Sequence, residues 1–198
     1  MRPQRHVILF VKAPRLGAVK TRLAADIGML EAWRFYRATV ARSLHRLGRD
    51  PRWRCVLSIT PDRFARGGPW FPPRLPQGSG DLGARMGRAL NSMPTGPAVL
   101  IGGDIPDIET GDMVQAFSEL ERHDMVFGPA SDGGYWLIGA RRRPLPHGLF
   151  RGVRWSSPHA LADTLANLSP HCRTALLAEH DDVDDGDDYR RWRARGSG

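Results

Sequence analysis

Short continuous apolar runs alternate along this chain with stretches in which apolar residues recur every three or four positions. The first run, His6–Val11, is β-branched and aromatic, which is typical of a buried parallel strand. Over residues 29–47 the apolar positions follow a helical period and predict an amphipathic helix. The two patterns therefore indicate strands and helices in turn from the N-terminus onward.

The same alternation continues to the C-terminus. Strands are expected at residues 54–60, 98–102, 125–127, 135–139 and 175–179. Five further helices are expected. One begins at Leu23, one ends at Asn91, one spans residues 110–122, one ends at Leu168, and the last lies at the C-terminus. Strands that alternate with helices predict an α/β fold, a three-layer α/β/α sandwich around a mostly parallel mixed sheet. Without a repeat or linker, residues 1–198 are expected to form one domain.

Turn residues refine three of these elements. A segment rich in Gly and Pro, residues 61–76, is expected to be a loop. Asp132-Gly-Gly134 precedes the strand at 135–139 and places that strand in a hairpin or at a sheet edge. Ser156 or Ser157 is expected to cap the helix that ends at Leu168.

The distribution of positive charge singles out one loop. The chain has 27 arginines but two lysines, Lys12 and Lys20, and both lie in the loop after the first strand. A compact ammonium differs from a planar guanidinium, and a basic turn between a strand and a helix N-terminus suits an anion. We therefore expect the loop to hold phosphate. A basic surface turn is the alternative. A Walker A loop is excluded because the motif's two glycines, the one directly before Lys20 and the one upstream, are both missing.

Carboxylates are expected at the same edge of the sheet. Asp104 follows a buried strand, between glycines and Pro106, where an open α/β sheet binds ligands. Because Mg²⁺ prefers carboxylate and phosphate oxygens, Asp104 could hold the ion against the basic loop, although it could also simply cap a turn. The segment 181–188 carries six more aspartates. Most should cap the terminal helix or face solvent, and Asp184 is expected to be the second metal ligand.

Five segments together resemble the nucleotide-diphospho-sugar transferase superfamily, which has the GT-A fold. They are residues 10–23, 77–86, 101–106, 132–139 and 182–189. The chain is similar in particular to a bacterial family usually described as glycosyltransferases, with members in arsenosugar biosynthesis. The resemblance covers nearly the whole chain. Asp185-Gly186 stands where that family usually has Thr-Pro, which leaves open whether Asp184 or a neighbouring aspartate binds metal.

The resemblance assigns roles to individual residues. The nucleotide-binding residues it implies are Lys12, Arg15, Gly17, Lys20, Arg22, Gln77, Gly78, Gly80, Asp81 and Gly83. The acceptor-binding residues are Asp132, Gly133, Gly134 and Tyr135, for which ordinary hairpin packing is the alternative. Asp104 and Asp184 would hold Mg²⁺ or Mn²⁺, and Lys12, Lys20 and Asp104 would be catalytic. A nucleotide or nucleotide-sugar donor and a small-molecule acceptor would be the partners.

Composition bears on the cellular compartment and on possible membrane or nucleic-acid partners. Cys55 and Cys172 lack the spacing of a disulfide framework, and no apolar run approaches the ~20 residues of a membrane span, so a cytoplasmic protein without a membrane partner is expected. The net charge of +8 could indicate nucleic-acid binding, but the arginines are scattered and the 181–188 cluster is acidic. Oligomeric state cannot be read from the sequence.

Two reactions fit the expected fold. Nucleotidylyl transfer from a nucleoside triphosphate releases pyrophosphate, and the cations of the first loop suit that leaving group. Glycosyl transfer releases a nucleoside diphosphate, and Asp132 would then activate the acceptor. Because the Asp-x-Asp motif of many glycosyltransferases is missing at Asp104, we favour nucleotidylyl transfer. A catalytically inactive member of the family is a further alternative.

Overall fold

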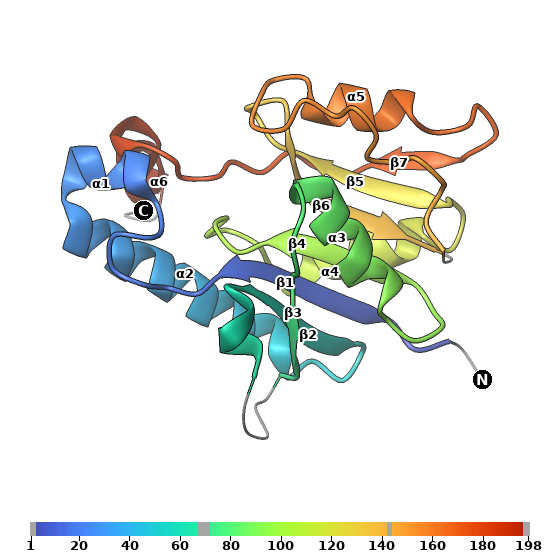
Figure 1. The fold of residues 1–198 in the computed structure, drawn as a ribbon, viewed down its shortest axis with the longest axis horizontal. Coiled ribbons are helices and arrows are strands. Elements are labelled where there is room, and N and C mark those ends of the chain that lie inside the picture. Colours follow the sequence, from blue (N-terminus) through green and yellow to red (C-terminus); the bar gives the residue numbers. More distant parts are fainter. Residues whose placement is uncertain (1–2, 67–71, 142–143, 196–198) are drawn as a thin grey trace.

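The computed structural model describes residues 3–66, 72–141 and 144–195 and is built around a seven-stranded sheet. The strand order is β3-β2-β1-β4-β6-β5-β7 (Figure 1). The strands are β1 (His6–Lys12), β2 (Arg54–Thr60), β3 (Arg74–Pro76), β4 (Ala98–Gly102), β5 (Met125–Pro129), β6 (Tyr135–Ala140) and β7 (Thr174–Leu176). β6 runs antiparallel to both β4 and β5, whereas the other neighbouring pairs are parallel. The sheet is therefore mixed and mostly parallel.

Helices cover both faces of this sheet. They are α1 (Thr21–Ile27), α2 (Met29–Gly48), α3 (Leu82–Asn91), α4 (Thr110–Glu119), α5 (Ala160–Ala166) and α6 (Gly186–Arg195). Side chains of α2 and α4 pack on one face, and those of α3 and α5 pack on the other. α1 and α6 contact each other beyond the sheet (Figure 1). The three-layer α/β/α sandwich predicted from the sequence is confirmed.

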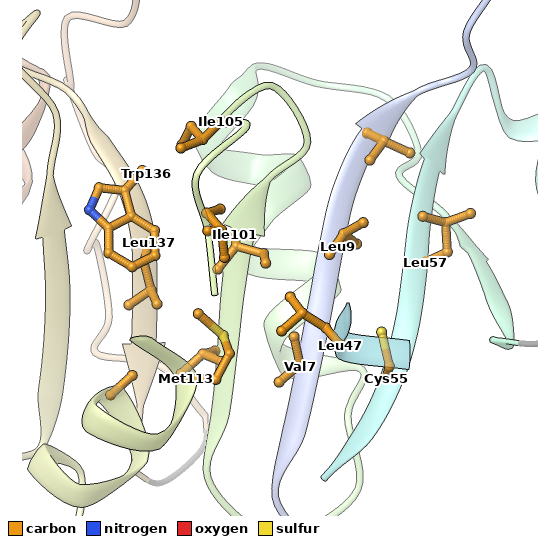
Figure 2. Close-up of a cluster of buried hydrophobic side chains, with 14 of the residues drawn as sticks. Val7, Leu9, Leu47, Cys55, Leu57, Ile101, Ile105, Met113, Trp136 and Leu137 are labelled. Carbon is orange, nitrogen blue, oxygen red and sulfur yellow. The ribbon is translucent and has the colours of Figure 1, made fainter. Parts of the chain in front are cut away.

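The first strand shows how the sequence produces two cores. Val7 and Leu9 point toward α2 and α4, whereas Ile8 and Phe10 point to the opposite face, because successive side chains of a strand alternate. Figure 2 shows the α2/α4 side, where Val7, Leu9 and Leu47 of α2 belong to one cluster of buried side chains. Both faces of β1 are buried, which explains its continuous apolar run.

Three details differ from the sequence-based expectation. The segment 61–76 is not only a loop, because it contains a 3₁₀ turn at Asp62–Ala65 and the short strand β3. β6 forms the expected hairpin with β5 but lies inside the sheet, since it also pairs with β4. The predicted serine cap is wrong: α5 begins at Ala160 after His159, and the Ser157 hydroxyl donates to the Arg154 carbonyl oxygen at 2.6 Å.

Strand order places a crevice at the carboxyl ends of β1 and β4. From β1 the chain moves outward to β2 and β3, then returns to β4 on the other side of β1. Such a reversal separates the connections that follow β1 and β4, and ligands bind in the gap between them. Lys12 ends β1, Lys20 ends the loop that follows, and Asp104 follows β4. The fold therefore brings the two predicted chemistries to one edge.

The segment between β7 and α6 crosses that edge (Figure 1). It is attached on the way, because the Trp136 Nε1 donates to the Ala178 carbonyl oxygen at 3.1 Å and the His180 N–H donates to the Pro129 carbonyl oxygen at 3.2 Å. The nearby carboxylate of Asp112, 3.2 Å from the His180 ring, raises the pKa of His180. These contacts hold the acidic residues 181–185 beside the crevice.

Candidate active site

The loop after β1 is anchored by two aromatic side chains of α2. The Tyr36 hydroxyl accepts from the Lys12 N–H at 3.0 Å and donates to the Lys12 carbonyl oxygen at 3.1 Å. The Trp33 Nε1 donates to the Pro14 carbonyl oxygen at 2.9 Å. The backbone is thus fixed on α2, while the side chain of Lys12 stays exposed and lines the cavity at the crevice.

Lys20 is held in an unusual position at the end of this loop. Its φ of 48° and ψ of 48° are left-handed, a conformation that costs a residue with a side chain about 1–2 kcal/mol. Its side chain is only 5% exposed, and its Nζ lies 2.6 Å from Asp184 Oδ1 and 3.4 Å from Asp104 Oδ2. Arg22 contacts the other oxygen of Asp184 from a position open to solvent. The predicted cations and carboxylates therefore meet.

A third carboxylate, which the sequence analysis did not select, joins this cluster. One oxygen each from Asp104, Asp182 and Asp184 lies within 4.8 Å of the others. Burial raises the pKa of Asp182, and the neighbouring Asp104 adds to the rise, whereas Lys20 opposes it. Three carboxylate oxygens at this separation form a set of hard oxygen donors, which suits Mg²⁺ or Mn²⁺.

The other aspartates of the acidic segment form hydrogen bonds or ion pairs with residues of the terminal helix or its start, as predicted. Asp185 accepts from the N–H groups of Asp187 at 2.9 Å and Asp188 at 3.0 Å, which caps α6. Asp188 in turn accepts from the N–H groups of Asp184 and Asp185. Asp26 of α1 accepts from the Gly186 N–H at 2.8 Å and fixes the helix start. These bonds leave the side chains of Asp182 and Asp184 to face the cluster.

The site opens into a cavity of about 470 Å³. Predicted site residues that line it are Lys12, Lys20, Arg22, Gln77, Asp104, Asp132, Gly134, Tyr135 and Asp184. Predicted site residues outside its lining are Arg15, Gly17, Gly78, Gly80, Asp81, Gly83 and Gly133. One cavity thus joins the basic loop, the carboxylates and part of the expected acceptor segment.

Two residues of the Gln77–Gly83 segment, Gln77 and Leu82, line the cavity. The Gln77 amide is buried, donates to the carbonyl oxygens of Val11 and Ser58 at 3.0 and 2.9 Å, and accepts from Arg85. These bonds tie the ends of β1 and β2 together and engage both ends of the amide. Asp81 caps α3 by accepting from the Ala84 N–H at 2.8 Å.

Packing explains the last glycine of that segment. A Cβ added at Gly83 would lie 2.5 Å from the Phe150 Cβ and 2.7 Å from the Trp155 ring. Such distances are too short for real contacts, so glycine lets α3 approach the two aromatic rings. The same helix contributes Leu82, Arg85 and Met86 to the cavity, none of which the sequence analysis had named as a site residue.

The expected acceptor segment forms the hairpin turn between β5 and β6. Asp132 Oδ1 accepts from the Gly134 N–H at 2.8 Å. The Tyr135 ring packs edge-on against Phe127, with ring centroids 5.6 Å apart, and burial raises the pKa of its phenol. Asp132 and Tyr135 therefore make the hairpin contacts that ordinary packing would require. Both residues also line the cavity.

Replacing Gly133 by alanine is expected to destabilise the protein by roughly 2–4 kcal/mol, because two separate costs add. Gly133 has a φ of 81°, and an added Cβ would lie 2.3 Å from the carbonyl oxygen of Pro158. Urea unfolding measures the effect. Gly152→Ala is the matched control, since Gly152 has a φ of 67° but open space around its Cβ position. Equal losses in both variants would show that the Pro158 contact contributes nothing.

The fold is that of the nucleotide-diphospho-sugar transferases, as comparison with known proteins shows. A family model described as "Uncharacterized protein conserved in bacteria (DUF2064)" matches residues 43–157, more than half of the chain. The chain belongs to this DUF2064 family. No curated protein sequence matches it.

Three solved structures show the same fold. A provisionally assigned nucleotide-diphospho-sugar transferase from Desulfovibrio desulfuricans has a TM-score of 0.87 and 29% identity, covering 98% of this chain and 88% of its own. The 4-diphosphocytidyl-2C-methyl-D-erythritol synthase of Anaerococcus prevotii has a TM-score of 0.64 and 9% identity, covering 98% and 99%. A Mycobacterium tuberculosis protein, Rv0371c, solved in complex with manganese, has a TM-score of 0.51 and 16% identity, covering 95% and 97%.

The predicted superfamily and fold are confirmed by these comparisons. The first two neighbours are named for transfer or synthesis with nucleotide groups, which supports the predicted class, a transferase enzyme. Within the described ranges, no helix is long and apolar enough to cross a bilayer.

Proposed function

We propose that this protein is a metal-dependent nucleotidylyltransferase that moves a nucleotidyl group from a nucleoside triphosphate to a small phosphorylated or hydroxylated acceptor. The observation that carries the proposal is the meeting of Lys20 with Asp104 and Asp184 on the wall of one cavity. A triphosphate needs cations on its leaving phosphates, and a bound divalent ion needs carboxylates beside them. The site offers both.

The carboxylates of Asp104, Asp182 and Asp184 would hold Mg²⁺ or Mn²⁺. Their oxygen donors and separation fit either ion, and the manganese complex of a protein with this fold agrees with that choice. The bound ion would neutralise phosphate charge and orient the α-phosphate. Asp182 completes the ligand set that the sequence analysis assigned to Asp104 and Asp184.

The basic side chains would bind the leaving group. Lys12 extends from the end of β1 into the cavity, and Lys20 and Arg22 flank the start of α1. An acceptor oxygen attacks the α-phosphorus, the bond from the α-phosphorus to the bridging oxygen breaks, and pyrophosphate leaves with the electron pair. Positive charge fixed beside the β- and γ-phosphates stabilises that developing charge. An acceptor hydroxyl would lose its proton to a nearby carboxylate, and Asp132 lines the cavity for this role.

Glycosyl transfer from a nucleotide-diphospho-sugar is the alternative. The name of the Desulfovibrio desulfuricans neighbour favours it, and Asp132 on the cavity wall could act as its base. The positive charge of Lys12, Lys20 and Arg22 in one cavity, however, exceeds what a diphosphate leaving group requires once a divalent ion is bound. The basic loop therefore favours the triphosphate.

A ligand panel separates the two reactions. Melting temperature is measured with Mg²⁺ and each common nucleoside triphosphate, and then with UDP- and GDP-sugars. A triphosphate at about 100 times its Kd stabilises by about 2.7 kcal/mol, which should raise the melting temperature by roughly 5–10 °C in a chain of this size. The matching pyrophosphate release is then assayed with candidate acceptors. Stabilisation by nucleotide sugars alone would replace the proposal by glycosyl transfer.

A further inference from the structure

The ammonium of Lys20 lies where a metal ion would have to contact the carboxylates. Its Nζ is within hydrogen-bonding distance of Asp184 Oδ1 at 2.6 Å and of Asp104 Oδ2 at 3.4 Å. The side chain is 5% exposed, so it is enclosed by the cluster and not extended into solvent. Lys20 is therefore the cation that Asp104 and Asp184 share, whereas Arg22 contacts Asp184 from the solvent side.

An ammonium in this place competes with a divalent ion for the same carboxylates. A metal ion needs its ligand oxygens at about 2.0–2.6 Å, and those of Asp104 and Asp184 already accept from Lys20. Two cations sharing one carboxylate oxygen also repel each other strongly inside a partly buried site. Lys20 must therefore move away before a divalent ion can bind the two oxygens that it now contacts.

The backbone of Lys20 limits where its side chain can go. The residue caps α1 in a left-handed conformation, and its carbonyl oxygen accepts from the Ala24 N–H at 2.8 Å. The side chain can rotate, but the residue stays at the start of α1, in a cavity that Lys12 and Arg22 also line. A buried ammonium that loses two carboxylates needs another anion nearby, and a polyphosphate bound by the same loop supplies it.

We infer that Lys20 exchanges carboxylates for phosphate, so that metal and polyphosphate enter together and the substrate form is the metal–nucleotide complex. This inference rests on the proposed function, because it needs both ligands at the one site. It predicts weak binding of a divalent ion alone and strong positive coupling between ion and nucleotide, which by linkage is reciprocal.

The test measures Mn²⁺ affinity without nucleotide, by the electron paramagnetic resonance signal of free Mn²⁺. Lys20→Met and Lys20→Gly should bind Mn²⁺ at least about 10-fold more tightly than wild type, a size within the usual range of coupling between sites. Glycine suits the left-handed backbone, so this variant keeps the test valid if the methionine variant folds poorly. Arg42→Met removes one exposed charge of α2 outside the cavity and should stay within about twofold.

The outcomes separate the inference from the function it rests on. Wild-type protein should gain Mn²⁺ affinity when a nucleoside triphosphate is added, and both Lys20 variants should lose that gain. Mn²⁺ affinities of both variants within twofold of wild type would overturn the exchange while leaving a metal-dependent transferase in place. Absence of Mn²⁺ binding in every protein, with or without triphosphate, would overturn the inference and the proposed function together.

Discussion

Replacing Asp104 by asparagine is expected to lower kcat/KM about 10³-fold, since a metal ion contributes several kcal/mol to stabilising the transition state. Asparagine keeps the shape of the side chain but removes the charge. The amide would also turn one of the three carboxylates around Lys20 into a much poorer ligand. The rate of pyrophosphate release with the triphosphate found by the ligand panel measures the loss.

Folding should survive this substitution. The Asp104 side chain is 42% exposed, so water can reach the new amide. Among the buried groups, Lys20 loses one charged partner but keeps its contact with Asp184. Asp187→Asn is the matched control, because Asp187 belongs to the acidic segment but is exposed and pairs with Arg190 on α6. A loss of activity in Asp187→Asn comparable to that in Asp104→Asn, or full activity in Asp104→Asn, would contradict the assigned ligand set.

Replacing Lys20 by arginine should reduce kcat/KM by about 10²-fold even though the charge is kept, an effect similar to losing one donor to a developing oxyanion. The ammonium sits in an enclosed space between Asp104 and Asp184. A guanidinium is larger, planar and fixed in its donor directions, so it cannot make the same two contacts in that space. Steady-state kinetics with Mg²⁺ measures the effect.

Arg22 provides the converse exchange in the same loop. Its side chain is 74% exposed and contacts one oxygen of Asp184 from the solvent side. Arg22→Lys should therefore change kcat/KM by less than about fivefold, in the range of an exposed ion pair. If Lys20→Arg lowered kcat/KM as little as Arg22→Lys, the site would not require an ammonium at position 20.

Much of the fold could be predicted from sequence because its central strands are buried on both faces. β1 and β4 carry continuous apolar runs, β2 is apolar from Cys55 to Ile59 except at Ser58, and the bounds of all three agree closely with the expected ranges. β3 was missed because a segment of three residues that ends in a proline is too short to carry a periodic signal. It forms a strand because its backbone pairs with β2. The start of α5 was also missed, because Ser157 bonds to Arg154 instead of capping the helix.

The candidate site was predictable where a strand end fixes a residue in space. Lys12 ends β1 and Asp104 follows β4, so adjacent parallel strands bring them to one edge. Asp182 could not be told apart from its acidic neighbours in the sequence. Which aspartates face the cluster depends on which of them cap α6, and that is visible only in the structure. The buried bonds of Gln77 depend on tertiary contacts that connect residues far apart in the chain.

The most direct test of the account is a crystal structure of the protein with Mn²⁺ and a non-hydrolysable nucleoside triphosphate, using the anomalous signal of manganese. The expected result is a manganese peak ligated by Asp104, Asp182 and Asp184, with the Lys20 ammonium on a phosphate oxygen. A fully bound nucleotide with no manganese at these carboxylates, or with Lys20 directed into solvent, would contradict it.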